Sequence, residues 1–168
     1  MQILSLHYNH KKYPDEKINE SIATILHSTT LFSVATIKNK NISHIHTAFF
    51  CYSLNLNLYF LTPPTTQHSL NVVINPSIAV SIFDSHQKPP DKKRGLQIFG
   101  NCHLAKGKDF NEGIVLYSRR FEWTRVIKNP QDLIKAGFES KLYIINPSSI
   151  KIFDEVIFGE EKWVTVNL

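Results

Sequence analysis

The sequence predicts a mainly β, α+β fold: a small closed or partly open antiparallel barrel with helices at its connections. Six or so short apolar runs show strand-type patterns and are separated by turn residues. The helical segments do not alternate regularly with them, which argues against a doubly wound parallel sheet. At 168 residues and 42% hydrophobic content, the chain is long and apolar enough for one buried core. We therefore expect one domain over residues 1–168, with residues 1–14 as an N-terminal extension.

The amino-acid composition limits which binding partners and which cellular compartment we expect. The net charge is +5, from 19 Lys+Arg and 14 Asp+Glu, which suits a phosphorylated ligand, nucleic acid or an anionic surface. The positive residues are scattered, and no aromatic-rich basic motif is present, so no nucleic-acid partner is expected. No stretch approaches the roughly 18 apolar residues of a membrane helix, and residues 1–13 do not resemble a signal peptide. We expect a cytoplasmic protein whose Cys51 and Cys102 are buried thiols.

The first half of the chain predicts one helix and an antiparallel meander. A helix is expected over residues 15–27, because apolar residues recur there at helical spacing and acidic residues occupy the first turn. Three strands follow, separated by turn residues such as Asn39 and Asn55. The predicted strands are residues 31–37, 42–52 and 56–62.

The second half adds three helices and further strands. Pro63 and Pro64 end the third strand, and a short helix runs to Ile74. A helix is also expected over residues 109–120, and another begins after an Asn129 cap and closes at Gly137. The remaining predicted strands are residues 78–83, 96–104, 141–145, 150–153 and 163–166.

Several common catalytic motifs are missing. The sequence has no Cys-x-x-Cys, no Gly-x-Ser-x-Gly, no phosphate loop and no Gly-x-Gly-x-x-Gly. His44 and His46 share one face of a predicted strand, so both could reach one metal ion. Because the sequence identifies no third ligand, we interpret them as two polar positions and expect no metal. The eight histidines also leave open a haem-ligand interpretation.

The segment from Thr62 to His68 is the most informative for function. It joins the end of a strand to the start of a helix, which brings backbone N–H groups, hydroxyls and the positive end of a helix dipole together. Such a place suits a phosphate group. Helix capping by Thr65 or Thr66 alone is an equally good interpretation.

Several segments, in this order and spacing, resemble one family. They are Leu58-Tyr59-Phe60-Leu61-Thr62, Thr65-Thr66-Gln67-His68, Asn75-Pro76-Ser77-Ile78-Ala79-Val80-Ser81, Gly95-Leu96-Gln97-Ile98-Phe99-Gly100, Tyr117-Ser118-Arg119-Arg120-Phe121 and Phe158-Gly159-Glu160-Glu161-Lys162-Trp163. Together they resemble the FMN-binding split barrel of the pyridoxamine 5'-phosphate oxidase type, in a branch of small bacterial proteins. The resemblance covers about residues 20–165.

The resemblance implies a six-stranded antiparallel split β-barrel with peripheral helices. It implies a homodimer with two FMN molecules in clefts between the barrels. The residues that match flavin-ring positions are His46, Thr47, Ala48 and Phe49. Those that match ribityl and phosphate positions are Thr62, Thr66, Gln67 and His68, next to Thr65. Gln97 and Trp163 lie in segments that approach the flavin from the partner subunit.

Two departures from the family pattern bear on function. Gln67 and His68 stand where family members usually carry Arg followed by Lys or His, and neutral Gln67 cannot make a charged bidentate phosphate contact. Trp163 is followed only by Val-Thr-Val-Asn-Leu, without the substrate-binding arginines of the true oxidase. We therefore expect an FMN-dependent oxidoreductase of unknown substrate, and not pyridoxamine phosphate oxidation. The alternatives are a haem-binding or haem-degrading protein and a non-enzymatic flavin-binding module.

Overall fold

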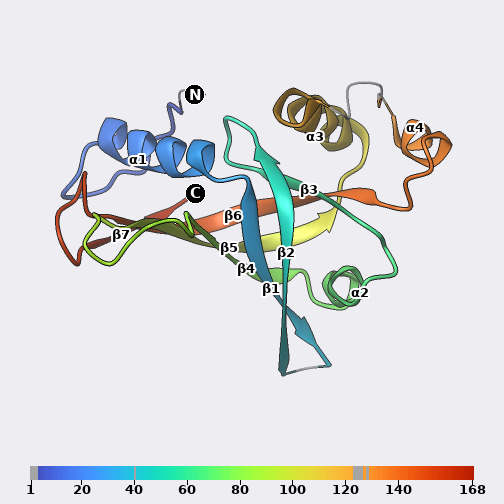
Figure 1. Ribbon diagram of the computed structural model, residues 1–168, viewed down its shortest axis with the longest axis horizontal. Coiled ribbons are helices and arrows are strands. Elements are labelled where there is room, and N and C mark those ends of the chain that lie inside the picture. The colour runs from blue at the N-terminus through green and yellow to red at the C-terminus, as the bar shows by residue number, and fades with distance from the viewer. Residues whose placement is uncertain (1–3, 40, 123–126, 128) are drawn as a thin grey trace.

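The structure is a computed structural model that describes residues 4–39, 41–122, 127 and 129–168. In these residues the chain forms four helices and seven strands (Figure 1). In chain order they are α1 (Asp15–Ser28), β1 (Leu31–Lys38), β2 (Ile42–Tyr52), β3 (Leu58–Thr62), α2 (Gln67–Ile74), β4 (Ser77–Phe83), β5 (Arg94–Leu104), α3 (Gly107–Arg120), α4 (Pro130–Lys135), β6 (Lys141–Asp154) and β7 (Trp163–Asn167). No described helix is long and apolar enough to cross a membrane.

Six of the described strands close into a ring. The strand order is β3-β2-β1-β4-β5-β6-β7, and β3 also pairs with β6, so that β7 alone lies outside the ring. Every pairing is antiparallel. Ring closure pairs the edge strand β3 with β6, so that β3 has a partner on both sides. The fold is a split β-barrel with peripheral helices, as the sequence predicts.

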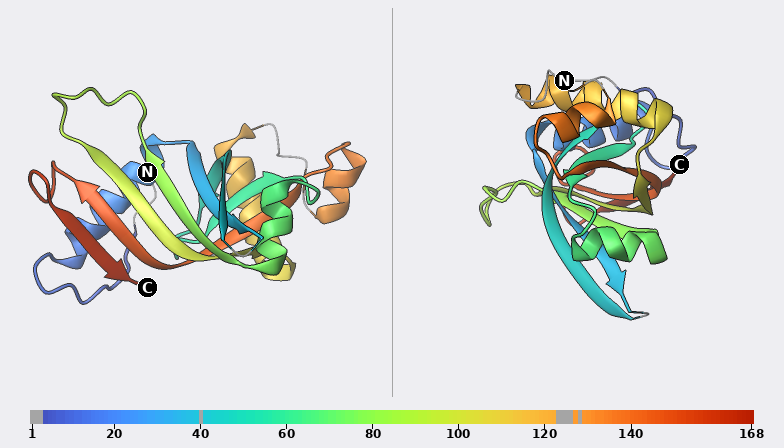
Figure 2. Two further views of the ribbon diagram at one scale, coloured as in Figure 1. Left: turned by 90° about the horizontal axis from the view of Figure 1, so that it is seen from below. Right: turned by 90° about the vertical axis from the view of Figure 1, so that its right-hand side faces the viewer.

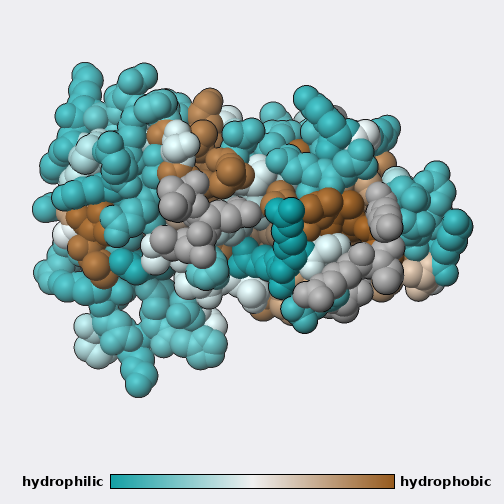
Figure 3. All heavy atoms as spheres, turned by 90° about the horizontal axis from the view of Figure 1, so that it is seen from above, coloured by the Kyte–Doolittle hydropathy of each residue, from teal (hydrophilic) through white to brown (hydrophobic). Residues whose placement is uncertain are grey.

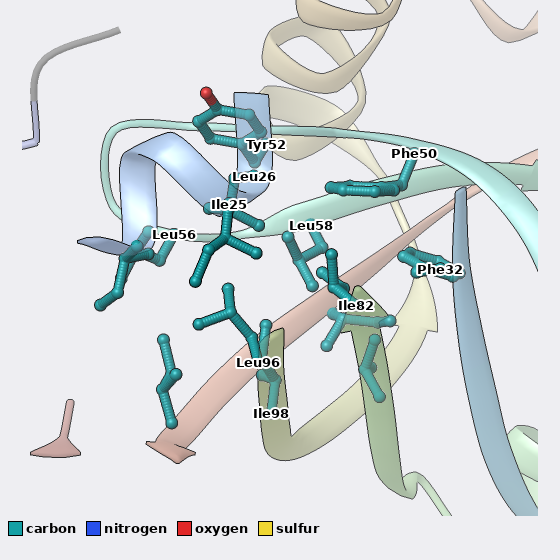
Figure 4. Packing of buried hydrophobic residues seen from close by; sticks show 14 of the residues in the cluster. Ile25, Leu26, Phe32, Phe50, Tyr52, Leu56, Leu58, Ile82, Leu96 and Ile98 are labelled. Atoms are coloured by element: carbon teal, nitrogen blue, oxygen red, sulfur yellow. The ribbon is translucent and has the colours of Figure 1, made fainter. Parts of the chain in front are cut away.

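The barrel interior is filled by alternating side chains of its strands. Figure 4 shows Phe32, Phe50 and Leu58 in this interior, with Ile25 and Leu26 of α1 beside them on the left. A second cluster lies on the other side of β2, β3 and β6, beneath α3, and includes Tyr59, which is fully buried. Both cysteines are free and buried, as expected.

The helices cover different sides of the sheet. In Figure 1, α1, α3 and α4 lie on the upper side of the molecule, whereas α2 lies on the lower side, beside β1 and β2. Figure 2 shows α2 against β1 and β2 in both views. Hydrophobic residues gather in patches among hydrophilic ones on the face that carries α1, α3 and α4 (Figure 3). The long helix α1 is tied to the sheet at the buried Asp154 carboxylate, which accepts hydrogen bonds from Ser21 Oγ at 2.7 Å and Arg94 Nε at 3.0 Å.

Most of the predicted elements are confirmed, and the exceptions have local causes. The prediction of separate strands over residues 141–145 and 150–153 is wrong, because β6 is one continuous strand. Pro147 interrupts the apolar pattern, yet it lies where the pairing of β5 with β6 shifts register and needs no ladder donor. The strand predicted from Leu56 begins at Leu58, since Leu56 has a φ of 62° and belongs to the turn.

Gly100 allows β5 to approach β6 at that register shift. A Cβ at position 100 would lie 2.2 Å from the Asn146 carbonyl oxygen and 2.8 Å from the Pro147 Cα. Both are backbone atoms, so the clash could be relieved only by moving a strand. Glycine is therefore required here by the space between two strands.

We expect Gly100→Ala to lower the free energy of unfolding by about 2 kcal/mol, since overpacking forces a backbone shift. Gly95→Ala, in the same strand, is the matched control, because its Cβ would lie 3.3 Å from the Ile82 carbonyl oxygen. Urea unfolding at pH 7 measures both. Equal losses of unfolding free energy in the two variants would contradict the claim that the close approach of two strands requires glycine at position 100.

Candidate functional site

The segment predicted to run along the flavin ring is divided between two faces of β2. His46 lies opposite the buried Val34, and Ala48 packs against the core, so both side chains point inward. Thr47 and Phe49 point outward, and Phe49 is 53% exposed. The strand therefore offers two surfaces with different chemistry.

Polar side chains form a row across the outer face of the sheet. Thr47 lies opposite Ser33, and their hydroxyl oxygens are 3.2 Å apart. The register continues from Ser33 to Ser81 and from Ser81 to Gln97. Thr47 and Gln97 are thus on the same face but three strand spacings, or about 14 Å, apart. One chain does not bring them into contact.

Exposed apolar side chains flank this row. They are Leu31, Ile45, Phe49, Phe83 and Phe99, which are between 42% and 69% exposed. Trp163 lies on the same face, with Lys151 Nζ 4.5 Å from the centre of its ring and the Phe153 ring 4.6 Å away. Apolar groups gathered on one face of a folded chain are typical of a binding or association surface.

The loop before α2 has the backbone features of an anion site. Thr66 occupies the N-cap position, but its side chain makes no capping hydrogen bond. Its Oγ1 instead donates to the Pro63 carbonyl oxygen at 2.9 Å. The N–H groups of the first turn of α2 are thus not capped by Thr66, contrary to the capping interpretation. Thr65 precedes the cap and is exposed.

The side chains of Gln67 and His68 are held by hydrogen bonds within the protein, so they are not available to an anion at the start of α2. Gln67 Nε2 donates to Asn71 Oδ1 at 2.8 Å. His68 Nε2 lies 2.6 Å from Thr62 Oγ1 and 3.0 Å from Thr66 Oγ1, with its ring against the barrel end. The residues therefore fit a phosphate through backbone N–H groups rather than through these two side chains. Lys141 lies directly opposite Thr62 in the pairing of β3 with β6.

Three histidines gather between β2 and α2. His44 and His46 share the inner face of β2, and His68 is the second residue of α2. The His46 and His68 rings stack with centroids 3.6 Å apart, and the His44 ring lies 6.5 Å and 6.1 Å from them. Sequence reasoning found the first pair but missed His68, because nothing local in the sequence shows that α2 folds over β2.

Several ring nitrogens of this histidine cluster are buried. Among the described residues, His44 Nδ1 and both ring nitrogens of His46 are buried without a hydrogen-bond partner. Burial, with repulsion from the neighbouring imidazoles, lowers the pKa of His46 to about 3 and that of His68 to about 4. Both imidazoles are therefore neutral near pH 7.

A separate cleft of about 500 Å³ lies between the end of α1, β2 and α3. It is lined by His27, Thr30, Cys51, Tyr52, Leu116, Arg119 and Arg120. The Arg120 guanidinium is already engaged there, because it donates to the carbonyl oxygens of Leu26 and Thr29. The cleft has the size of an ordinary small-molecule pocket.

The lowered pKa values of His46 and His68 predict that acid destabilises the folded chain. Below pH 6.5 the unfolded chain binds protons at these histidines while the folded chain does not, so the free energy of unfolding should fall as the pH drops from 7 to 5. His46→Gln removes one such group and should make this fall shallower. Besides His44 and His68, the titratable neighbours in this space are Cys102 and Tyr143.

Urea unfolding at pH 7 and pH 5, with EDTA present, measures this effect. His103→Gln is the control, because His103 is exposed on β5. An unchanged pH dependence in His46→Gln would contradict the effect of burial on His46.

Comparison with known proteins identifies the fold. No family model matches the sequence, and no curated protein matches it. Solved structures do match. A haem-binding protein from Mycobacterium smegmatis superposes with a TM-score of 0.70 at 11% identity, over 88% of this chain and 57% of that one. This chain therefore spans less than two thirds of that protein's length.

Two further structures match over most of their length. HutZ, the haem storage protein from Vibrio cholerae, has a TM-score of 0.61 at 14% identity, over 76% of this chain and 88% of its own. A Listeria innocua protein provisionally named pyridoxamine 5'-phosphate oxidase has a TM-score of 0.60 at 19% identity, over 79% and 95%. These likenesses, at identities below 20%, show that this chain shares its fold with the three proteins.

Proposed function

We propose that this protein is a homodimer that binds FMN between its barrels and acts as a flavin-dependent oxidoreductase on a small molecule. The observation that carries the proposal is the start of α2, where the Thr66 side chain makes no capping bond. First-turn N–H groups and the helix dipole favour a phosphate at such a point. Thr62 and Thr66 lie beside it, with their hydroxyls engaged by His68 Nε2 and the Pro63 carbonyl oxygen.

Lys141 is our candidate for the positive charge that Gln67 does not supply. It lies opposite Thr62, and residues directly opposite in an antiparallel pair point to the same side of the sheet. Gln67 and His68 would contribute backbone N–H groups, because their side chains are engaged elsewhere. Thr65, exposed in the same loop, would add a hydroxyl.

The flavin ring would lie along the outer face of β2. Thr47 and Phe49 would contact it with their side chains, whereas His46 and Ala48 would offer only backbone. Gln97 and Trp163 are too far across the sheet to join Thr47 in one chain, so they would come from the second copy. The exposed apolar side chains around the polar row support this face as the dimer interface.

Bound FMN would supply the redox chemistry, and the chain would position it and exclude water. Oxidation of pyridoxamine phosphate is not part of the proposal. Turnover with a nicotinamide donor would distinguish an oxidoreductase from a non-enzymatic flavin-binding module.

Haem is the second candidate, favoured by the cleft beside α3. His27 offers an axial ligand there, and Arg119 offers a positive charge for a propionate. Two of the similar structures are haem proteins by name. If haem binds at this cleft, adding haemin should give a stoichiometric Soret shift, and His27→Ala should remove it. His86→Ala is the control and should leave the shift unchanged, because His86 is exposed.

An FMN titration followed by flavin fluorescence tests the leading proposal. We expect saturable binding, one FMN per chain, at micromolar concentrations. Lys141→Ala should weaken binding about tenfold, the equivalent of about 1.4 kcal/mol. Lys135→Ala, an exposed lysine of α4, should leave it unchanged.

Two results would count against this account. The absence of saturable FMN binding would reject the flavin function. Equal affinity of the Lys141 and Lys135 variants would reject Lys141 as the compensating charge while leaving the flavin function standing.

A further inference from the structure

The histidine cluster has the composition and spacing of a metal site. Each of His44, His46 and His68 offers one ring nitrogen, and these three nitrogens all lie within 4.8 Å of one another. Two ligands come from alternate residues of one strand and the third from a helix packed over it, so the elements themselves hold the rings together. An imidazole nitrogen binds Zn²⁺ at about 2.0–2.1 Å. Because the lone pair lies in the ring plane, the His46 and His68 rings, which stack at an interplanar angle of 9°, would turn out of the stack to bind one ion.

The unpartnered nitrogens point to a missing ligand. Buried polar atoms in folded proteins nearly always have a partner. In the described part of the chain, both nitrogens of His46 and Nδ1 of His44 have none. The space lined by His46, His68 and Cys102 leaves no room for a water molecule. A metal ion, in contrast, would occupy only the space between the nitrogens that bind it.

Neighbouring hydroxyls fix the third ring. His68 Nε2 is held by Thr62 Oγ1 at 2.6 Å and Thr66 Oγ1 at 3.0 Å. With Nε2 engaged, His68 Nδ1 is the nitrogen left for a metal. Hydrogen bonds of this kind orient histidine ligands in metal proteins.

A hydrogen bond between side chains also joins α2 to the sheet beneath the cluster. Asn71 Nδ2 of α2 donates to Thr36 Oγ1 at 2.9 Å, and Thr36 lies opposite His44. The helix that carries His68 is thereby fixed to the sheet that carries the other two histidines. The cluster is a supported arrangement rather than a chance meeting of surface side chains.

We propose that His44, His46 and His68 bind one divalent transition-metal ion of the Zn²⁺, Co²⁺ or Ni²⁺ type. Three imidazole ligands without a carboxylate favour these borderline metals over Mg²⁺ or Ca²⁺. Three protein ligands leave a fourth position for water or a small ligand, which would lie outside the closed space lined by His46, His68 and Cys102. The metal site would use ring nitrogens at the barrel end, whereas FMN would use backbone N–H groups of α2 and the outer face. The two sites are neighbours, because both border Thr62 and Thr66.

Titration of metal-free protein without a histidine tag tests this proposal. After EDTA treatment and its removal, Co²⁺ should bind one ion per chain and give the intense visible absorption of a four-coordinate complex. Zn²⁺ should displace it and raise the melting temperature. Mg²⁺ should do neither.

Substitutions assign the ligands. His46→Ala and, separately, His44→Ala should weaken Co²⁺ binding by at least about 100-fold. His103→Ala is the matched control and should bind Co²⁺ as the unchanged chain does. His44→Ala at the less buried end of the strand, with circular dichroism of the metal-free variants, separates ligand loss from misfolding.

The proposal is overturned if the unchanged chain binds no Co²⁺ stoichiometrically, or if folded His44→Ala and His46→Ala bind it as tightly as His103→Ala. FMN titration of the metal-free protein runs in parallel. Loss of metal binding with FMN binding retained would reject only the metal site, and the reverse result would reject only the flavin site.

Discussion

The pairing of β3 with β6 is the constraint on which the rest of the molecule depends. It joins Leu58–Thr62 to Lys141–Ile145 and turns an open sheet into a ring. Closure fixes where β3 ends, and so where the loop and α2 begin. That position carries α2 across β1 and β2 and sets Lys141 beside Thr62. The pairing also requires β6 to bend at its contact with β5, where Gly100 removes the side chain that would obstruct it.

Local patterns in the sequence were enough for most of the fold. The apolar stripe of α1, the three-strand meander and the cap at Asn129 each depend on residues a few positions apart. The continuity of β6 could not be predicted in this way, because Pro147 resembles a strand end until its partner Gly100 is known. Closure itself is a long-range contact, and no local periodicity encodes it.

Strand alternation explains why the candidate site divides into two parts. Thr47 and Phe49 face outward with Gln97, whereas His46 faces inward, so four consecutive residues of β2 serve two surfaces. Of the residues chosen from the family resemblance, only Thr47, Phe49, Gln97 and Trp163 are among those placed on the outer surface. The inner one could not be completed from the sequence, because His68 reaches His46 only through the packing of α2 on the sheet. An outer face for a flat cofactor and an inner site for a metal ion can therefore coexist in one barrel.

The visible absorption spectrum of freshly purified protein, repeated on the supernatant after heat denaturation, tests the flavin account most directly. Our account predicts flavin bands in the native protein and a released yellow chromophore that mass spectrometry identifies as FMN. A protein that is colourless when purified, and remains colourless after incubation with FMN and removal of the excess, would contradict it.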